Sequence, residues 1–384
     1  MRTPVRLFRA AVLCLAVAGL AGCGLFSTTD PRFDPAELTE YTPTLAVSAR
    51  WTAAIGSGGD YGFSPQLVGS AVYAATPSGA VAAVDLDTGA IRWRATGGQP
   101  LQAGVGSNGN TTAVVTRQGM VVAYDAQGQE RWQAQAASAV NIPPAVGNGI
   151  VAVRTTDYRI QAFDEATGKL RWSVQRPGPA LALRTSMRMT MVPGNLVAGM
   201  PNGRLLVIDT ASGAVRWEGT IAASRGASDL ERISDVVGQP LAAGPLLCGV
   251  SYQGRTLCFD ISQGGRALWA QDISSATGLD ADGERLYLAD LHDAAHALSL
   301  RDGQEAWKQS ALLNRHLTSP AFAGRAVAFG DYEGYLHFLS RADGSLMARV
   351  QLGGGPIQSA PLTTPRGVVV QTGAGNLILV GVSD

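Results

Sequence analysis

An eleven-residue segment recurs along this chain and restricts the possible folds more than any other feature of the sequence. The clearest copy reads AVDLDTGAIRW at residues 83–93, and close copies occupy 162–172 and 207–217. More divergent copies end at Trp132, Trp269 and Trp307. A glycine precedes the tryptophan by four residues in all six copies, at Gly89, Gly128, Gly168, Gly213, Gly265 and Gly303. A seventh copy keeps Gly344 but has Ala348 in the tryptophan position.

Each copy has the pattern of a β-hairpin. Apolar residues in strand pattern lead into an aspartate, a polar turn closes on the glycine, and a second strand follows. The aspartate can accept backbone N–H groups across the turn, and glycine can adopt a positive φ without steric cost. A tryptophan at a fixed offset would bury a large apolar surface at an equivalent place in every unit. We therefore expect these tryptophans to dock each unit against its neighbour, with the indole N–H reaching a carbonyl.

The spacing of the repeats indicates a β-propeller. Successive glycines are separated by 39, 40, 45, 52, 38 and 41 residues, close to the roughly 40 to 45 residues of a four-stranded blade. Each unit also contains two earlier strand-like runs, such as 65–69 and 71–76, which brings the number of strands per unit to four. We expect an all-β fold of four-stranded antiparallel blades.

The two ends of the chain complement each other. The first strand-like residues, 47–52, contain Trp51 without a preceding hairpin turn, and the last unit, 367–382, lacks both a docking tryptophan and a fourth strand. If the N-terminal strand supplies the outer strand of the last blade, the ring closes without exposed edges. The propeller would then span residues 46–384, and one docking role would apply to Trp51, Trp93, Trp132, Trp172, Trp217, Trp269 and Trp307.

Residues 1–22 have the pattern of an export signal. Three arginines precede an apolar run that is too short for a comfortable membrane span. The small residues before Cys23 resemble the bacterial lipobox, which implies cleavage before Cys23 and lipidation of that cysteine; a short spanning anchor is the alternative. Gly24 implies forwarding to the periplasmic face of the outer membrane, where several acyl chains would hold the protein firmly. We expect residues 23–45, which contain three prolines, to form a flexible tether.

The charge balance excludes some classes of partner. The chain has 30 basic and 30 acidic residues, and removal of the three signal arginines leaves 27 against 30, a net charge of −3. Nothing in this balance indicates a nucleic-acid-binding or basic membrane-binding surface.

Two of the cysteines, Cys248 and Cys258, flank a presumed turn at 252–254. Opposed hairpin residues can approach closely enough for a disulfide, and an exported protein permits one. Cys258 also occupies a position that is alanine or valine in other hairpins, so a small core residue is an equally good interpretation.

No pattern of residues predicts a catalytic or metal site. The four histidines form no recognisable motif, and His292 and His296 lie in a strand-rich unit where their spacing does not direct both toward one metal. The regularly placed aspartates are explained by the hairpin turns.

The two longest intervals place extra sequence in adjacent units, at 174–190 and 219–240. Both stretches follow a tryptophan strand, so both would connect an outer strand to the next inner strand on one face of the ring. Leu181 and Leu183 on one side of a strand, with Arg184 beside them, make an apolar and cationic combination suited to a protein contact. The alternative is that these residues and the methionines after them begin the next inner strand.

Four further stretches carry a closer resemblance: LALR at 181–184, ERISDV at 231–236, LLNRHLTSP at 312–320 and GDYEGYLHFLS at 330–340. With the repeats and the lipobox, they resemble the BamB family of propeller lipoproteins, part of the machinery that assembles outer-membrane β-barrels. The resemblance implies eight blades, no cofactor, and binding to the periplasmic domains of BamA, with unfolded outer-membrane proteins as a further partner class. The family's contact positions carry over to Leu181, Leu183, Arg184 and Asp235. A second acid often found two residues beyond that aspartate is replaced here by Val237.

Three functions therefore compete. The leading hypothesis is a non-enzymatic scaffold that supports barrel assembly. A quinoprotein-like dehydrogenase is the main alternative, although the adjacent cysteine pair typical of those enzymes is absent. A ligand-binding sensor propeller would need polar and aromatic residues gathered at the mouth of the central channel.

Overall fold

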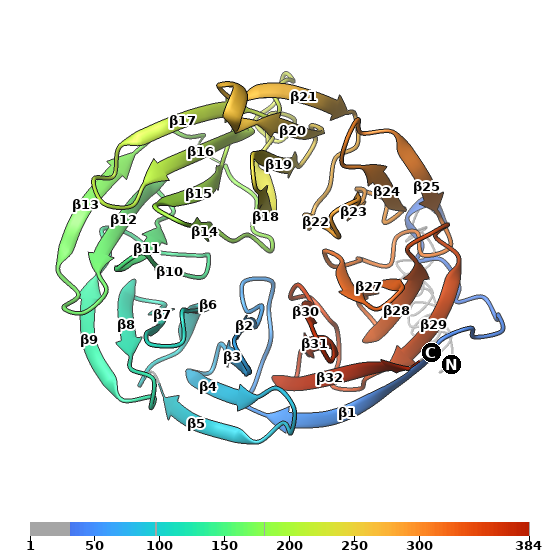
Figure 1. The fold of residues 1–384 in the computed structure, drawn as a ribbon, viewed down its shortest axis with the longest axis horizontal. Helices are drawn as coiled ribbons and strands as arrows, with labels where there is room; N and C mark the ends of the chain where they lie inside the picture. The colour runs from blue at the N-terminus through green and yellow to red at the C-terminus, as the bar shows by residue number, and fades with distance from the viewer. Residues whose placement is uncertain (1–30, 97, 180, 384) are drawn as a thin grey trace, which may run out of the picture.

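The protein is a ring of eight four-stranded antiparallel sheets (Figure 1). The structure is a computed structural model, and it describes residues 31–96, 98–179 and 181–383. The predicted signal peptide, Cys23 and the first part of the predicted tether lie outside these residues. In each sheet, strands follow one another from the axis outward in chain order, except in the sheet that joins the two ends of the chain.

The first four blades are β2–β5 (Gln66–Val68, Ala71–Ala75, Ala80–Asp85, Ile91–Thr96), β6–β9 (Leu101–Ser107, Thr112–Thr116, Met120–Tyr124, Glu130–Gln135), β10–β13 (Ala145–Gly147, Ile150–Arg154, Arg159–Asp164, Leu170–Gln175) and β14–β17 (Thr190–Val192, Asn195–Met200, Arg204–Asp209, Val215–Thr220). The next three are β18–β21 (Val236–Ala243, Leu246–Ser251, Thr256–Asp260, Arg266–Gln271), β22–β25 (Leu279–Ala281, Arg285–Ala289, Ala295–Ser299, Glu305–Gln309) and β26–β29 (Ala321–Ala323, Ala326–Gly330, Tyr335–Ser340, Leu346–Gln351). The eighth contains β30 (Leu362–Thr364), β31 (Gly367–Gln371), β32 (Asn376–Ser383) and β1 (Ala46–Ala54).

The core lies between the blades, and the sequence of each strand reflects its depth. In the second strand of a blade, such as β3 or β11, all five residues are buried because both faces of the sheet pack against neighbouring blades. In the outer strand β13, only Trp172 is buried. This gradient in burial explains why the second strands are continuous apolar runs. It also explains why apolar residues alternate with polar or charged residues in the outer strands.

The ring is closed by the two ends of the chain. Strand β1 pairs antiparallel with β32, so that Val47 lies opposite Val382 and Thr52 opposite Ile378. The predicted closure is therefore confirmed, and the sheet edge that each end would otherwise expose is covered.

Each tryptophan docks on the glycine of the next blade's outer hairpin. A Cβ on Gly168, for example, would lie 2.6 Å from the ring of Trp132, and the indole N–H of Trp132 donates to the carbonyl of Glu165 at 3.0 Å. The same contact recurs in the pairs Gly89–Trp51, Gly128–Trp93, Gly213–Trp172, Gly265–Trp217, Gly303–Trp269 and Gly344–Trp307. These glycines therefore meet two requirements: each has a positive φ, and each leaves room for an indole.

The same geometry explains Ala348 in the seventh copy of the repeat. The eighth blade has no outer hairpin, because its outer pair is formed by the two ends of the chain. A tryptophan at position 348 would therefore have no hairpin glycine to dock on. Instead, Leu45 packs in the same buried cluster as Ala348, and the backbone N–H of Thr44 donates to the carbonyl of Met347 at 2.9 Å.

The aspartates of the hairpins hold the turns as predicted. Asp85 accepts from the backbone N–H of Thr88 at 2.9 Å and forms an ion pair with Arg92 at 2.7 Å. These hydrogen bonds, that from Arg92 being the strongest, lower the pKa of Asp85 to about 2.

Cys248 and Cys258 lie directly opposite each other on β19 and β20 and are joined by a disulfide. Both are fully buried in the core. The predicted disulfide is therefore confirmed. Cys258 is also a small core residue, as the alternative interpretation expected.

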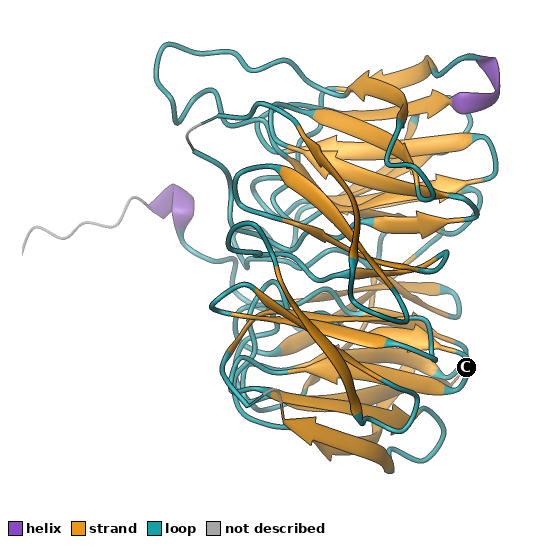
Figure 2. Cartoon of the chain, turned by 90° about the vertical axis from the view of Figure 1, so that its left-hand side faces the viewer, coloured by secondary structure: helices purple, strands orange, loops and turns teal. Residues whose placement is uncertain are grey.

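The described part of the predicted tether is held against the ring. Residues 31–45 begin with the short helix η2 (Pro31–Phe33) and then run along the sixth and seventh blades. The backbone N–H of Ala36 donates to the carbonyl of Leu313 at 2.9 Å, and Arg315 Nη1 donates to the carbonyl of Ala36 at 2.9 Å. Leu38 packs against the cluster around Trp307. The expectation of a free segment is wrong for these residues, because their backbone groups find partners on the ring. Figure 2 shows η2 on the face where the long connections project.

Candidate partner-binding surface

The two longest connections between blades lie side by side on one face of the ring. Residues 176–189 link β13 to β14, and residues 221–235 link β17 to β18. Both run from an outer strand to the next inner strand, so both project on the face with the longer loops in Figure 2. The backbone N–H of Leu183 in the first connection donates to the carboxylate of Asp235 in the second at 2.7 Å. The prediction of neighbouring insertions on one face is confirmed.

Residues 181–184 do not form the strand that the sequence pattern suggested. They are an extended connection, and β14 begins only at Thr190. Pro177 and Pro179 lie just before this stretch, and proline has no N–H to contribute to a sheet ladder. Met187 and Met189, which the alternative interpretation assigned to the inner strand, are buried in the core ahead of it.

The three predicted contact residues in this connection differ in exposure. Leu181 is 44% exposed, and the side chain of Arg184 also projects into solvent, where it forms an ion pair with Asp60 at 2.5 Å. Leu183 is half-buried and packs against the core. Leu181 and Arg184 are therefore available to a partner, whereas Leu183 mainly anchors the connection.

Asp235, the predicted acidic contact, lies behind this surface. It is only 1% exposed, and its carboxylate accepts the backbone N–H of Leu183 at 2.7 Å. Burial raises the pKa of Asp235, against the opposing effects of the Leu183 hydrogen bond and the charge of Arg154. Asp235 thus positions the connection from beneath.

Two residues that the sequence analysis missed complete this support. Arg154, at the end of β11, is buried and donates to Met187 Sδ at 3.3 Å and to the carbonyl of Gly199. The hydroxyl of Tyr158 donates to the carbonyl of Pro179 at 2.8 Å. The only signal in the sequence was a single arginine at the end of the otherwise apolar strand IVAVR.

Exposed apolar side chains also occur elsewhere on this face. Leu230, in the second connection, is 67% exposed, and Phe33 of η2 is 64% exposed. A cavity of about 380 Å³ is lined by Leu183 and Arg184 together with Tyr61, Tyr252 and Tyr332. Aromatic, apolar and cationic groups of this kind are enriched in protein interfaces.

The sequence is similar to that of a known family over most of its length. A family model described as outer membrane protein assembly factor BamB matches residues 77–309 and 293–383. A protein of Bordetella pertussis named outer membrane protein assembly factor BamB is 52% identical over 377 residues, which cover 98% of each chain. The chain belongs to the BamB family.

Solved structures agree on the architecture. A crystal structure of BamB from Moraxella catarrhalis superposes with a TM-score of 0.79 at 22% identity, covering 88% of this chain and 100% of the other. A europium-containing methanol dehydrogenase superposes with a TM-score of 0.67 at 15% identity, covering 86% and 85% of the two chains. Since both identities are low, these similarities show the propeller fold that the BamB family shares with dehydrogenases.

Two of the four histidines of this BamB-family chain, His296 and His337, have carboxylate partners. His296 lies between Asp290 and Glu305, at 3.1 and 2.6 Å, and the buried His337 contacts Asp331 at 2.9 Å. In the described part of the chain, no three side chains of the metal-binding types gather in one place. Nor does any helix among the described residues have the length and apolar character to cross a membrane.

Proposed function

We propose that this chain is a non-enzymatic scaffold of the outer-membrane β-barrel assembly machinery that binds the periplasmic domains of BamA. The observation that carries the proposal is the connection 181–184, which exposes Leu181 and Arg184 while Asp235, Arg154 and Tyr158 hold it from beneath. A supported loop of this kind can present an apolar and a cationic group at little entropic cost on binding. Membership of the BamB family supplies the class of partner.

Substitutions on this connection should weaken partner binding without unfolding the ring. We expect Leu181→Asp and Arg184→Glu each to cost about 1 to 4 kcal/mol of binding free energy if the residues are central contacts. Matched controls are Leu170→Asp and Arg366→Glu, which alter an exposed leucine and an exposed, ion-paired arginine outside the connection. Binding to purified BamA periplasmic domains and the melting temperature would be measured on all four variants. Wild-type affinity in both connection variants, with the fold intact, would place the partner surface elsewhere.

Asp235→Arg provides a further arm of the same test. Because Asp235 is buried, the variant should lower both binding and melting temperature, and a charge reversal on the partner should not restore affinity. Restoration by a partner charge reversal would instead show a direct ionic contact, contrary to the buried position of this carboxylate.

We also propose that Cys23 is lipidated and anchors the protein to the periplasmic face of the outer membrane. Residues 31–45 are held on the ring, so only the short segment between Cys23 and Pro31 would separate the anchor from the face that carries Leu181 and Arg184. Cys23→Ala should yield a folded protein that is released from membranes at high salt in a strain lacking the partner complex. Membrane retention under those conditions would contradict the lipid anchor.

A further inference from the structure

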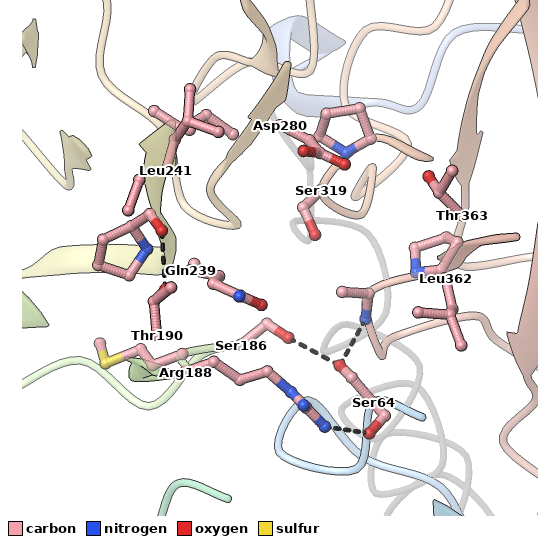
Figure 3. A pocket seen from close by; sticks show the side chains of 18 residues that line it. Ser64, Ser186, Arg188, Thr190, Gln239, Leu241, Asp280, Ser319, Leu362 and Thr363 are labelled. Carbon is pink, nitrogen blue, oxygen red and sulfur yellow. Dashed lines mark hydrogen bonds between the residues drawn. The ribbon is translucent and has the colours of Figure 1, made fainter. Parts of the chain in front are cut away.

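The axis of the ring contains a second cavity, of about 320 Å³, that no part of the proposed function uses. It is lined by the inner strands, and the residues just before them, of the first blade and of the fourth to eighth blades (Figure 3). Its volume falls within the range of small-molecule sites. Its walls carry one cationic and one anionic side chain, Arg188 and Asp280.

Arg188 brings a positive charge into this cavity, and no carboxylate among the described residues pairs with it. Its Nη2 donates to the carbonyls of Ser64 and Val105 at 2.6 and 3.0 Å, and its Nη1 donates to Gln66 Oε1 at 3.4 Å. Its Nε is buried and has no hydrogen-bond partner among the described residues. Desolvation lowers the pKa of Arg188 to about 10, and no acidic side chain contributes to the shift. Neutral carbonyls hold the guanidinium in place but leave its charge uncompensated.

Asp280 lines the wall opposite Arg188 in Figure 3 and carries the opposite charge. One carboxylate oxygen of Asp280 accepts a hydrogen bond from the backbone N–H of Ala281 at 2.8 Å. No described residue forms an ion pair with Asp280. Desolvation raises the pKa of Asp280 to about 6, with a smaller contribution from the charge of Asp282. Two opposite charges, each desolvated and each unpaired, therefore face the same space from different sides.

Two neutral groups in the cavity also have free hydrogen-bonding capacity. The amide of Gln239 and the hydroxyl of Ser319 line the cavity, and neither side chain forms a hydrogen bond with another described residue. Both are labelled in Figure 3 between Arg188 and Asp280. They could bind the polar middle of a molecule whose ends reach the two charges.

We propose that the axial cavity binds a small zwitterionic molecule, with its anionic group at Arg188 and its cationic group at Asp280. Such a ligand compensates both desolvated charges at once, which a singly charged molecule cannot do. This site is separate from the partner surface, so it stands or falls independently of the proposed function.

The test uses a series of ω-amino acids with increasing separation between their charges: glycine, β-alanine, 4-aminobutyrate and 6-aminohexanoate. Butyrate and butylamine are the singly charged controls. We expect at least one member of the series to bind the mature protein one to one in calorimetry, at least about tenfold more tightly than either control. Asp280→Asn should weaken that binding at least about tenfold.

Loss of binding in Asp280→Asn must not reflect unfolding. Because the unpaired carboxylate is desolvated, the neutral amide should leave the melting temperature equal to or above that of the wild type at neutral pH. Asp272→Asn, at a side chain that is 93% exposed, is the matched control and should bind the ligand normally. The proposal would be overturned if no ω-amino acid bound the wild type at up to about 10 mM. Equal binding by butyrate or butylamine, or by the folded Asp280→Asn variant, would also overturn it.

Discussion

Deletion of residues 46–54 is expected to open the ring and to lower its stability more than any single substitution. The deletion removes the whole of β1, including its eight paired positions with β32, and exposes an unpaired strand edge. It also removes Trp51, whose indole packs on Gly89 and donates to the carbonyl of Leu86 at 2.8 Å. Loss of that side chain alone should cost about 3 kcal/mol or more.

Thermal melts followed by circular dichroism, with light scattering to detect aggregation, would measure this effect. Trp51→Ala separates the docking contact from strand pairing and should produce a smaller loss. A deletion variant that melts like the wild type and remains monomeric would show that β1 does not close the ring in solution.

Trp172→Ala and Gly213→Val are expected to damage the same contact between the third and fourth blades from opposite sides. Truncating Trp172 leaves a cavity and should cost about 3 to 5 kcal/mol. Any side chain at Gly213 adds a Cβ 2.8 Å from the Trp172 ring at a φ of 76°, so valine should cost about 2 kcal/mol or more. Leu170→Ala, at an exposed position of the same strand, should change stability by less than about 0.5 kcal/mol.

Combining the two changes distinguishes a shared contact from two independent defects. In the double variant, the space left by Trp172 can accept part of the valine, so the loss of unfolding free energy should be smaller than the sum of the single losses. Denaturant unfolding of the three variants measures this coupling. Strict additivity would mean that Trp172 and Gly213 do not meet in the folded protein.

The architecture could be predicted because it repeats locally. The signature of each hairpin lies within eleven residues of sequence. The aspartate, the glycine and the tryptophan could therefore be assigned roles without knowing which residues of other blades they contact. Closure of the ring could be predicted because the last unit lacks a docking tryptophan, whereas Trp51 near the N-terminus has no hairpin turn before it. The role of each glycine beneath the next indole was not predictable, since that contact joins adjacent blades.

The residues that hold the candidate surface from beneath could not be predicted from the sequence for a similar reason. Asp235 could be identified as a contact position from family resemblance, but its carboxylate bonds to the backbone of Leu183, which is 52 residues away in the chain. Arg154 is one arginine in an apolar strand, and only the folded ring brings it beneath the connection. Residues 31–45 have no periodic pattern because they follow the ring's surface without joining a sheet.

The central claim is that the face carrying Leu181 and Arg184 binds BamA. The most direct measurement is a calorimetric titration of the folded mature protein with the purified periplasmic domains of BamA from the same organism. We expect saturable one-to-one binding that is weakened by Leu181→Asp and unchanged by Leu170→Asp. Absence of binding between the two folded proteins would contradict the proposed function.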